Sequence, residues 1–179
     1  MKKIILMLTV FTLGFTFTNC SDDDKWGDGE PSMEHVYYIG FQDWGKLKND
    51  VVFNVKAGNT QAIPVQFHSE RVRSYDVVTY YYTSGTPVSG VDFLVVDESG
   101  NVLQPDANGA YKIDWPKAVK GIKNIYVKAL KVSAKPLIVS TFKPDAGEIS
   151  HPDNITNSKT NDYEVRAFSQ NYKVTVNLK

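Results

Sequence analysis

Apolar and polar residues alternate without a break in Tyr172-Lys173-Val174-Thr175-Val176-Asn177-Leu178-Lys179, at the end of the chain. Successive side chains of a β-strand point to opposite faces, so this period of two predicts a strand. One face carries the aromatic and aliphatic residues and the other carries lysine, threonine and asparagine. Antiparallel sheets often have one face on the core and one in water, which explains the alternation.

The same period of two recurs along much of the chain, and no segment has apolar residues at helical spacing. The alternating runs occupy residues 35–39, 51–56, 63–68, 75–82, 125–129, 137–141 and 163–167. About eight or nine strands separated by turn signals predict an all-β protein, either an antiparallel sandwich or a barrel. Pro64 lies inside one run, and because proline lacks an N–H, it predicts an edge position or a bulge there.

The balance of charges and the content of strand-forming residues and cysteine exclude some classes of protein. The 179 residues carry 20 Lys and Arg against 20 Asp and Glu, a formal net charge of zero. This balance excludes the basic field that would attract nucleic acid, and Tyr, Phe, Val and Thr favour strands over helices. Cys20 is the one cysteine, so disulfides within the chain are excluded by counting.

The N-terminus has the layout of a signal peptide. Met1-Lys2-Lys3 is positive and residues 4–17 are largely apolar, a run shorter than the about 20 residues that span a membrane. Cys20 follows, and directly after it come Ser21, Asp22, Asp23 and Asp24. This arrangement resembles the lipoprotein signals of the Bacteroidota, in which the cysteine is the cleavage and acylation point and an acidic stretch directs export to the cell surface.

That resemblance implies a protein tied to the outer membrane by acyl chains on Cys20 and facing the cell surface. Residues 1–19 are then the signal peptide, and residues 20–33, rich in acids with glycine and proline, are a flexible tether. Residues 34–179 remain as one β-sandwich domain, because that length fits a single domain.

A second resemblance rests on Ser84-Gly85-Thr86-Pro87-Val88-Ser89-Gly90-Val91-Asp92-Phe93. A small-residue turn followed by Gly-x-Asp-aromatic resembles the centre of the Calx-β class of immunoglobulin-like domains. Further along come Ile113-Asp114-Trp115, Gly121, Ile125-Tyr126-Val127, and a closing hairpin from Asp162-Tyr163-Glu164-Val165 to Val174-Thr175-Val176. The resemblance implies an immunoglobulin-like antiparallel sandwich. With the N-terminus, it is similar to the small immunoglobulin-like lipoproteins of glycan-utilisation loci, which are generally non-enzymatic.

Residues that could bind a metal or catalyse a reaction do not form a recognised motif. Calcium prefers six to eight oxygen ligands, and no acidic run surrounds Asp92, which is expected to cap its turn instead. His35, His68 and His151 lack metal-ligand spacing, and no Gly-x-Ser-x-Gly elbow occurs. We therefore expect no enzyme activity and no cofactor.

Aromatic residues suggest one binding hypothesis, since sugars stack on exposed indole and phenol rings. The candidates are Trp44, Trp115, Tyr80, Tyr81 and Tyr82. The alternative is that these rings fill the core of the sandwich. Alternation must point one of Tyr81 and Tyr82 outward.

The sequence therefore predicts a surface-exposed, non-catalytic lipoprotein that serves as an accessory or adhesion module, associated with a glycan uptake system. Two alternatives stay open. One is a carbohydrate-binding protein that uses the aromatic residues, and the other is a module that docks a neighbouring outer-membrane protein by pairing an edge strand. A long bare edge strand would favour docking.

Overall fold

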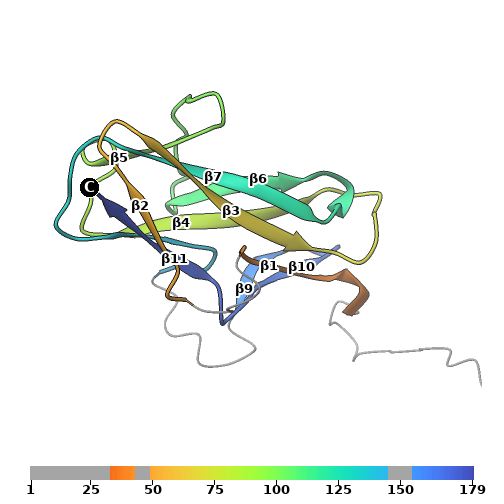
Figure 1. The fold of residues 1–179 in the computed structure, drawn as a ribbon. Coiled ribbons are helices and arrows are strands. Elements are labelled where there is room, and N and C mark those ends of the chain that lie inside the picture. Colours follow the sequence, from red (N-terminus) through yellow and green to blue (C-terminus); the bar gives the residue numbers. More distant parts are fainter. Residues whose placement is uncertain (1–32, 43–48, 145–154) are drawn as a thin grey trace, which may run out of the picture.

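The computed structural model describes residues 33–42, 49–144 and 155–179, and all statements on structure concern these residues. Cys20, the acidic stretch from Ser21 to Asp24, the expected signal peptide and all of the expected tether except Met33 lie outside them. The described chain forms eleven strands and two 3-10 helices, η1 (Met33–His35) and η2 (Pro116–Ala118) (Figure 1). The strands are β1 (Val36–Phe41), β2 (Val52–Val55), β3 (Thr60–His68), β4 (Val77–Gly85), β5 (Phe93–Val96), β6 (Ala110–Trp115), β7 (Gly121–Ala129), β8 (Leu137–Ser140), β9 (Thr156–Lys159), β10 (Glu164–Ala167) and β11 (Lys173–Leu178). No helix in the described part is long and apolar enough to cross a membrane.

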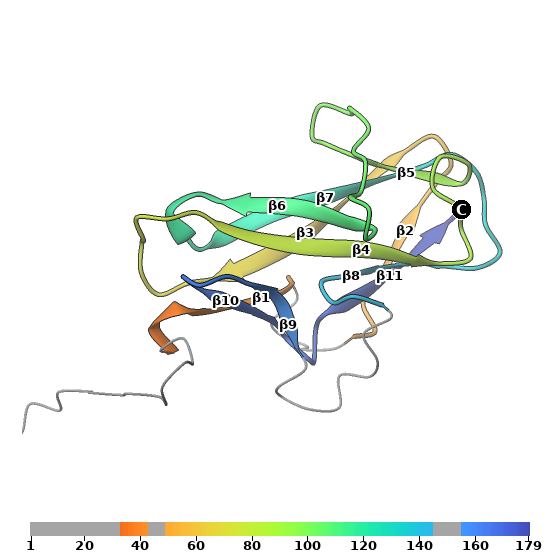
Figure 2. The ribbon, with the colours of Figure 1, turned by 180° about the vertical axis from the view of Figure 1, so that it is seen from behind.

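Two sheets pack face to face, which confirms the predicted all-β sandwich (Figures 1 and 2). Sheet A has the strand order β5-β7-β3-β1-β10-β9, and sheet B has the order β2-β11-β8-β4-β6. Neighbouring strands are antiparallel except for β1 with β10 and β2 with β11, which run parallel. Parallel partners need a long connection, and here strands far apart in the sequence become neighbours.

Consecutive strands alternate between the two sheets from β1 through to β9. Among the described strands, only β9 and β10 follow each other in the sequence and also pair side by side. All other connections between consecutive described strands therefore cross from one sheet to the other, so the chain links the two sheets repeatedly.

The core lies between the sheets and is built from the apolar members of the alternating runs. In β11, Val174, Val176 and Leu178 are buried, whereas Thr175 on the other face is half-buried. In β3, Ile63, Val65 and Phe67 are buried in the same way. The period of two therefore predicted which side chains face inward.

Pro64 corrects one detail of the sequence reasoning, because it lies in β3, a central strand of sheet A between β7 and β1. Its pairing with Asn124 of β7 is regular. The Pro64 carbonyl accepts a hydrogen bond from the N–H of Gln42 at 2.9 Å, so this residue's main-chain groups face the β1 side. β1 ends at Phe41, so no ladder bond is lost there, and neither an edge nor a bulge is needed.

β10 falls within the alternating run expected at residues 163–167, whereas β9 was not expected as a strand, because residues 156–159 lie outside every alternating run. β9 pairs with β10 in sheet A, and its side chains reach across to β4 of sheet B. Beyond the end of β8, the Asn157 amide bonds both main-chain groups of Tyr80, and the Ser158 hydroxyl donates to the carbonyl of Val78. The hairpin thereby closes one side of the sandwich.

Candidate functional site

Trp115 is a core residue and cannot present its ring to a sugar. The side chain is buried, and the indole stacks on Phe67 with ring centroids 4.9 Å apart. Its Nε1–H donates to the Thr79 hydroxyl at 2.9 Å, which satisfies the buried donor. The ammonium of Lys123 lies 5.3 Å from the indole centroid.

The other aromatic candidates do not come together either. Tyr81 is buried and stacks on Tyr111 at 5.0 Å, and burial raises the pKa of the Tyr81 hydroxyl. Tyr80 and Tyr82 point to the other face of β4, where both are half-buried. Trp44 lies outside the described residues. The prediction that one of Tyr81 and Tyr82 points outward is confirmed, but the structure does not assemble the five residues into a sugar-binding platform.

Asp92 caps its turn, as the sequence predicted. Its Oδ2 accepts the N–H of Val88 at 2.8 Å, inside the loop that joins β4 to β5. Asp97 does the same at the next turn, where Oδ1 accepts the N–H of Asn101 at 2.8 Å. Hydrogen bonds from Asn101 lower the pKa of Asp97. Both carboxylates therefore stabilise turns by bonding main-chain groups.

The two described histidines contact tyrosine and phenylalanine side chains. Nδ1 of His35 lies 2.6 Å from the hydroxyl of Tyr75, which in turn lies 2.7 Å from that of Tyr37. His68 on β3 packs edge-on against Phe168, and burial lowers its pKa. His151 lies outside the described residues. Within the described ranges, no group of three His, Cys, Asp or Glu side chains could hold a metal ion.

The edge strands of the two sheets could also bind a partner. Three of the four edges are protected against pairing with another strand. The free side of β5 is covered by its own connection, since Leu103 N–H donates to Val95 O at 2.9 Å. β9 carries a bulge opposite Val165 and Arg166 and ends in Lys159. Bulges and edge lysines are common protections against unwanted strand pairing.

β6 is the third protected edge. Both main-chain groups of Ala110 bond Asp106, and the carbonyl of Asp114 accepts a hydrogen bond from the Lys123 ammonium at 2.5 Å. Lys112 and Asp114 form an ion pair at 2.7 Å between exposed side chains on this strand. An incoming strand would meet charged side chains along most of this edge.

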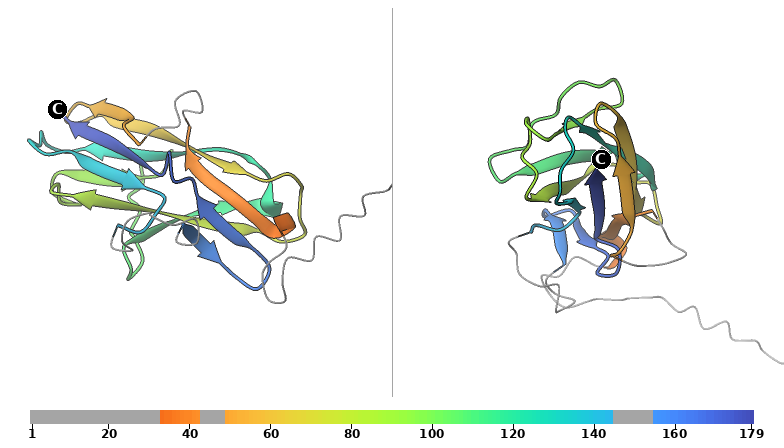
Figure 3. Two further views of the ribbon diagram at one scale, coloured as in Figure 1. Left: turned by 90° about the horizontal axis from the view of Figure 1, so that it is seen from below. Right: turned by 60° about the vertical axis from the view of Figure 1, so that its left-hand side comes forward.

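β2 is the remaining edge and lies beside β11 at the end of sheet B (Figure 3). Val51 O accepts from Thr175 N at 2.9 Å, and Val55 O accepts from Lys179 N at 2.8 Å. Main-chain groups of alternate residues point to opposite sides of a strand, so Val52 and Asn54 direct their N–H and C=O groups away from β11. In residues 33–42, 49–144 and 155–179, nothing pairs with these four groups.

The side chains of β2 suit an exposed edge that accepts a partner. Val52 is 51% exposed, and neither a charged residue nor a proline occurs within Val52–Val55. Phe53 packs partly against the core, and the Asn54 side chain bonds that of Asn177 at 3.1 Å. The strand is therefore anchored on one side and open on the other.

Asn49 fixes the start of this edge, and sequence reasoning missed it. Its Oδ1 accepts the N–H groups of Tyr172 at 2.9 Å and Lys173 at 3.3 Å, and its Nδ2 donates to Ser169 O at 2.8 Å. These bonds set the parallel register of β2 on β11. An asparagine just before an apolar run was the sole signal, and many loop residues share it.

The chain matches no protein-family model and no curated protein. Among solved structures, it is similar to the solution structure of CaCohA2 from Clostridium acetobutylicum, with 16% identity and a TM-score of 0.40 over 80% of this chain and 92% of that chain. It is also similar to a chain in the crystal structure of the CaDoc0917–CaCohA2 complex, with 14% identity and a TM-score of 0.38 over 80% of this chain and 99% of that chain. At TM-scores this low, the likeness carries no inference about function.

Proposed function

We propose that this protein is a surface-exposed, non-catalytic lipoprotein that docks a protein partner by adding a strand to β2. The edge of β2 carries the proposal, because the outward main-chain groups of Val52 and Asn54 have no partner among the described residues and can accept an extended segment of another protein. The N-terminal signal and Cys20 support the lipid anchor at the outer membrane.

Strand addition explains the composition of the edge. Main-chain hydrogen bonds supply affinity that does not depend on the partner's sequence, while side chains at alternate positions supply specificity. Val52 offers an exposed apolar contact at this edge, and the added strand would extend sheet B next to β2. A partner with a short extended segment therefore fits the site.

A proline substitution tests the proposal directly. Asn54→Pro removes an outward-facing N–H and the side-chain bond to Asn177, but it leaves the main-chain bonds from β2 to β11, and edge strands tolerate proline in that orientation. Lys112→Pro is the matched control, because Lys112 also faces outward, on the protected edge β6. A photo-reactive amino acid at position 52 would report contact with a partner in living cells of the native host.

We expect one discrete cross-linked product from the otherwise native protein, its loss in Asn54→Pro, and its retention in Lys112→Pro. Thermal melts should show that both proline variants stay folded. If no product forms at position 52, or if both proline variants behave alike, docking at β2 is wrong.

A further inference from the structure

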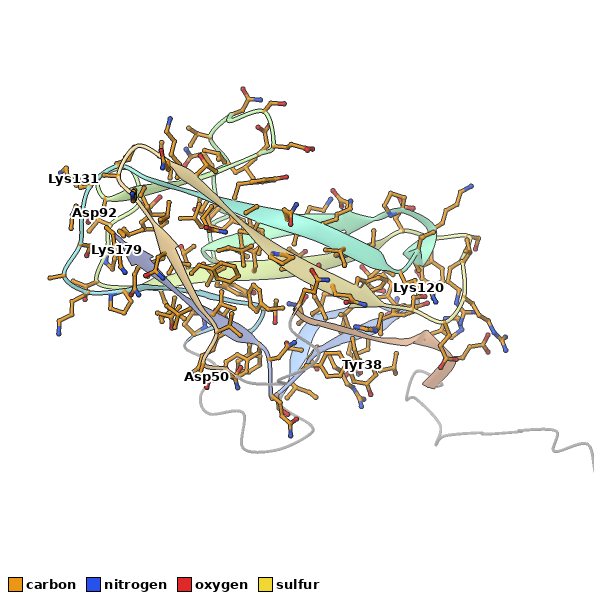
Figure 4. The ribbon with its side chains drawn as sticks, in the orientation of Figure 1. Tyr38, Asp50, Asp92, Lys120, Lys131 and Lys179 are labelled. Atoms are coloured by element: carbon orange, nitrogen blue, oxygen red, sulfur yellow. The ribbon has the colours of Figure 1, made fainter. Side chains whose placement is uncertain are left out.

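The loops at the end of the sandwich that carries Lys179 are held together by main-chain hydrogen bonds. This distal end consists of segments 55–60, 85–92, 129–136 and 176–179, and Figure 4 labels Asp92, Lys131 and Lys179 there. Asp92 O accepts from Leu130 N at 2.8 Å and from Lys131 N at 3.2 Å, which joins the β4–β5 loop to the β7–β8 loop.

Further bonds complete the connection around the distal end. Ser133 N donates to Leu178 O at 3.0 Å, Ala57 N donates to Lys179 O at 2.6 Å, and Gly58 N donates to Ala129 O at 2.8 Å. Each of the four segments is therefore bonded to at least one other. A surface held in this way is pre-organised, so a partner would pay little ordering cost when it binds.

Aliphatic side chains project from this end into solvent. Val88 is 55% exposed, Val91 is 47% exposed and Val132 is 69% exposed. The first two lie in the loop that Asp92 caps, and the third lies in the loop bonded to it. Single exposed apolar residues are normal on protein surfaces, but here three lie on two loops that are bonded together.

The distal end is also basic, in contrast to the neutral chain as a whole. Its segments contain four lysines, at positions 56, 131, 135 and 179, and one acid, Asp92. All four lysines are exposed, and none forms an ion pair within the described part of the chain. The one carboxylate offsets one of the four lysines, which leaves a net side-chain charge of +3 (four lysines minus one acid) over these segments.

We propose that the distal end is a second interaction surface, which binds an acidic protein through aliphatic contacts surrounded by charge. Complementary charge speeds association and selects partners, while buried apolar contacts hold the complex. An acidic polysaccharide fits less well, because the exposed apolar residues at this end are valines, and aromatic rings are what stack on sugars.

The placement of the distal end agrees with this role. η1 lies at the opposite end of the sandwich, where Glu34 bonds Arg73 at 2.8 Å (Figure 1). Since β1 follows η1 directly, an N-terminal anchor would join the sandwich at the end opposite the distal end. The proposal does not depend on strand addition at β2, and its test leaves β2 unchanged.

The test uses the detergent-solubilised full chain with arrays of short synthetic peptides and with polygalacturonate. One peptide set combines acids with aliphatic residues, the second combines lysines with aliphatic residues, and the third combines acids with serine. The variant is Lys131→Glu with Lys135→Glu. The control is Lys117→Glu with Lys120→Glu, which changes net charge equally at a distance from the distal end (Figure 4 labels Lys120).

We expect the acidic aliphatic set to bind best, with binding weakened by salt and reduced by about tenfold in the distal variant but not in the control. Three results would overturn the proposal. The first is an equal loss of peptide binding in the distal variant and in the control. The second is binding of polygalacturonate or of the acid-serine set as tight as that of the acidic aliphatic set, and the third is self-association through the distal end in place of peptide binding.

Discussion

At the scale of single residues, buried polar groups in this sandwich have specific partners. The Trp115 indole N–H is satisfied by the Thr79 hydroxyl, and both residues are buried. A hydrogen bond of this kind adds modest net stability, but its loss leaves a buried donor without a partner. The Thr79 hydroxyl therefore removes the free-energy penalty of burying the Trp115 indole N–H without an acceptor.

Replacing Thr79 with valine keeps its shape and removes the hydroxyl. We expect Thr79→Val to lower the free energy of unfolding by about 1–3 kcal/mol, because the Trp115 N–H is then buried without an acceptor. Thr175→Val is the matched control, since Thr175 is half-buried on the outward face of β11. Urea denaturation followed by tryptophan fluorescence measures both variants, and equal losses would contradict this role for Thr79.

At the scale of elements, β9 belongs to sheet A by its main chain and contacts sheet B by its side chains. The Asn157 amide donates to Tyr80 O at 2.7 Å and to Thr141 O at 2.6 Å, and its Oδ1 accepts Tyr80 N–H at 2.9 Å. These bonds replace the ladder that β8 would have continued. Asn157 thus satisfies Tyr80, while Ser158 and Tyr163 satisfy Val78, on the side of β4 that β8 does not reach.

We expect Asn157→Ala to expose the main-chain groups of Tyr80 and to loosen the β9–β10 hairpin from β4. Hydrogen exchange of the Tyr80 amide should accelerate, while amides of β3 should keep their protection, because local opening is cheaper than global unfolding. Asn101→Ala is the control, since Asn101 bonds an exposed turn. Unchanged exchange at Tyr80 would show that this amide does not hold the hairpin.

The alternating runs of the sequence coincide with eight of the eleven described strands, and β5, β6 and β9 lie outside them. β3, β4 and β11 were recognised because their inward side chains recur every second residue. β9 (Thr156–Lys159) was missed, since Thr-Asn-Ser-Lys carries no apolar face and is held by side-chain bonds to another sheet. Pro64 was misplaced because a sequence does not show where the neighbouring strand ends.

The candidate site was harder to predict than the fold. Asp92 was interpreted correctly as a turn cap, since that role depends on residues close in sequence. Trp115 and Tyr81 were named as possible sugar contacts, but exposure depends on which face of β4 and β6 meets the core. The open edge of β2 depends on strand order between distant segments, so no local pattern could indicate it.

At the scale of the whole molecule, the two ends of the sandwich differ. η1 and the Glu34–Arg73 ion pair, 2.8 Å long, lie at one end, and the cross-bonded loops lie at the other. The lipid anchor proposed for Cys20 would enter at the η1 end.

We expect Cys20→Ala to abolish lipid modification while the domain still folds, because Cys20 is the sole cysteine and the described strands that build the sandwich begin at Val36. Labelling cells with a clickable palmitate analogue measures the modification. Ser21→Ala is a control that leaves the thiol in place. Equal labelling of Cys20→Ala and the native protein would rule out the lipoprotein assignment.

The alternation of consecutive strands between the sheets also limits the order in which the two sheets can form during folding. β11 lies between β2 and β8, so sheet B stays in two parts until the last strand is available. Pairing of segments distant in sequence makes folding slow, in the range of milliseconds to seconds for all-β domains. For the exported protein proposed above, sheet B could therefore not be completed until β11 had left the translocation channel.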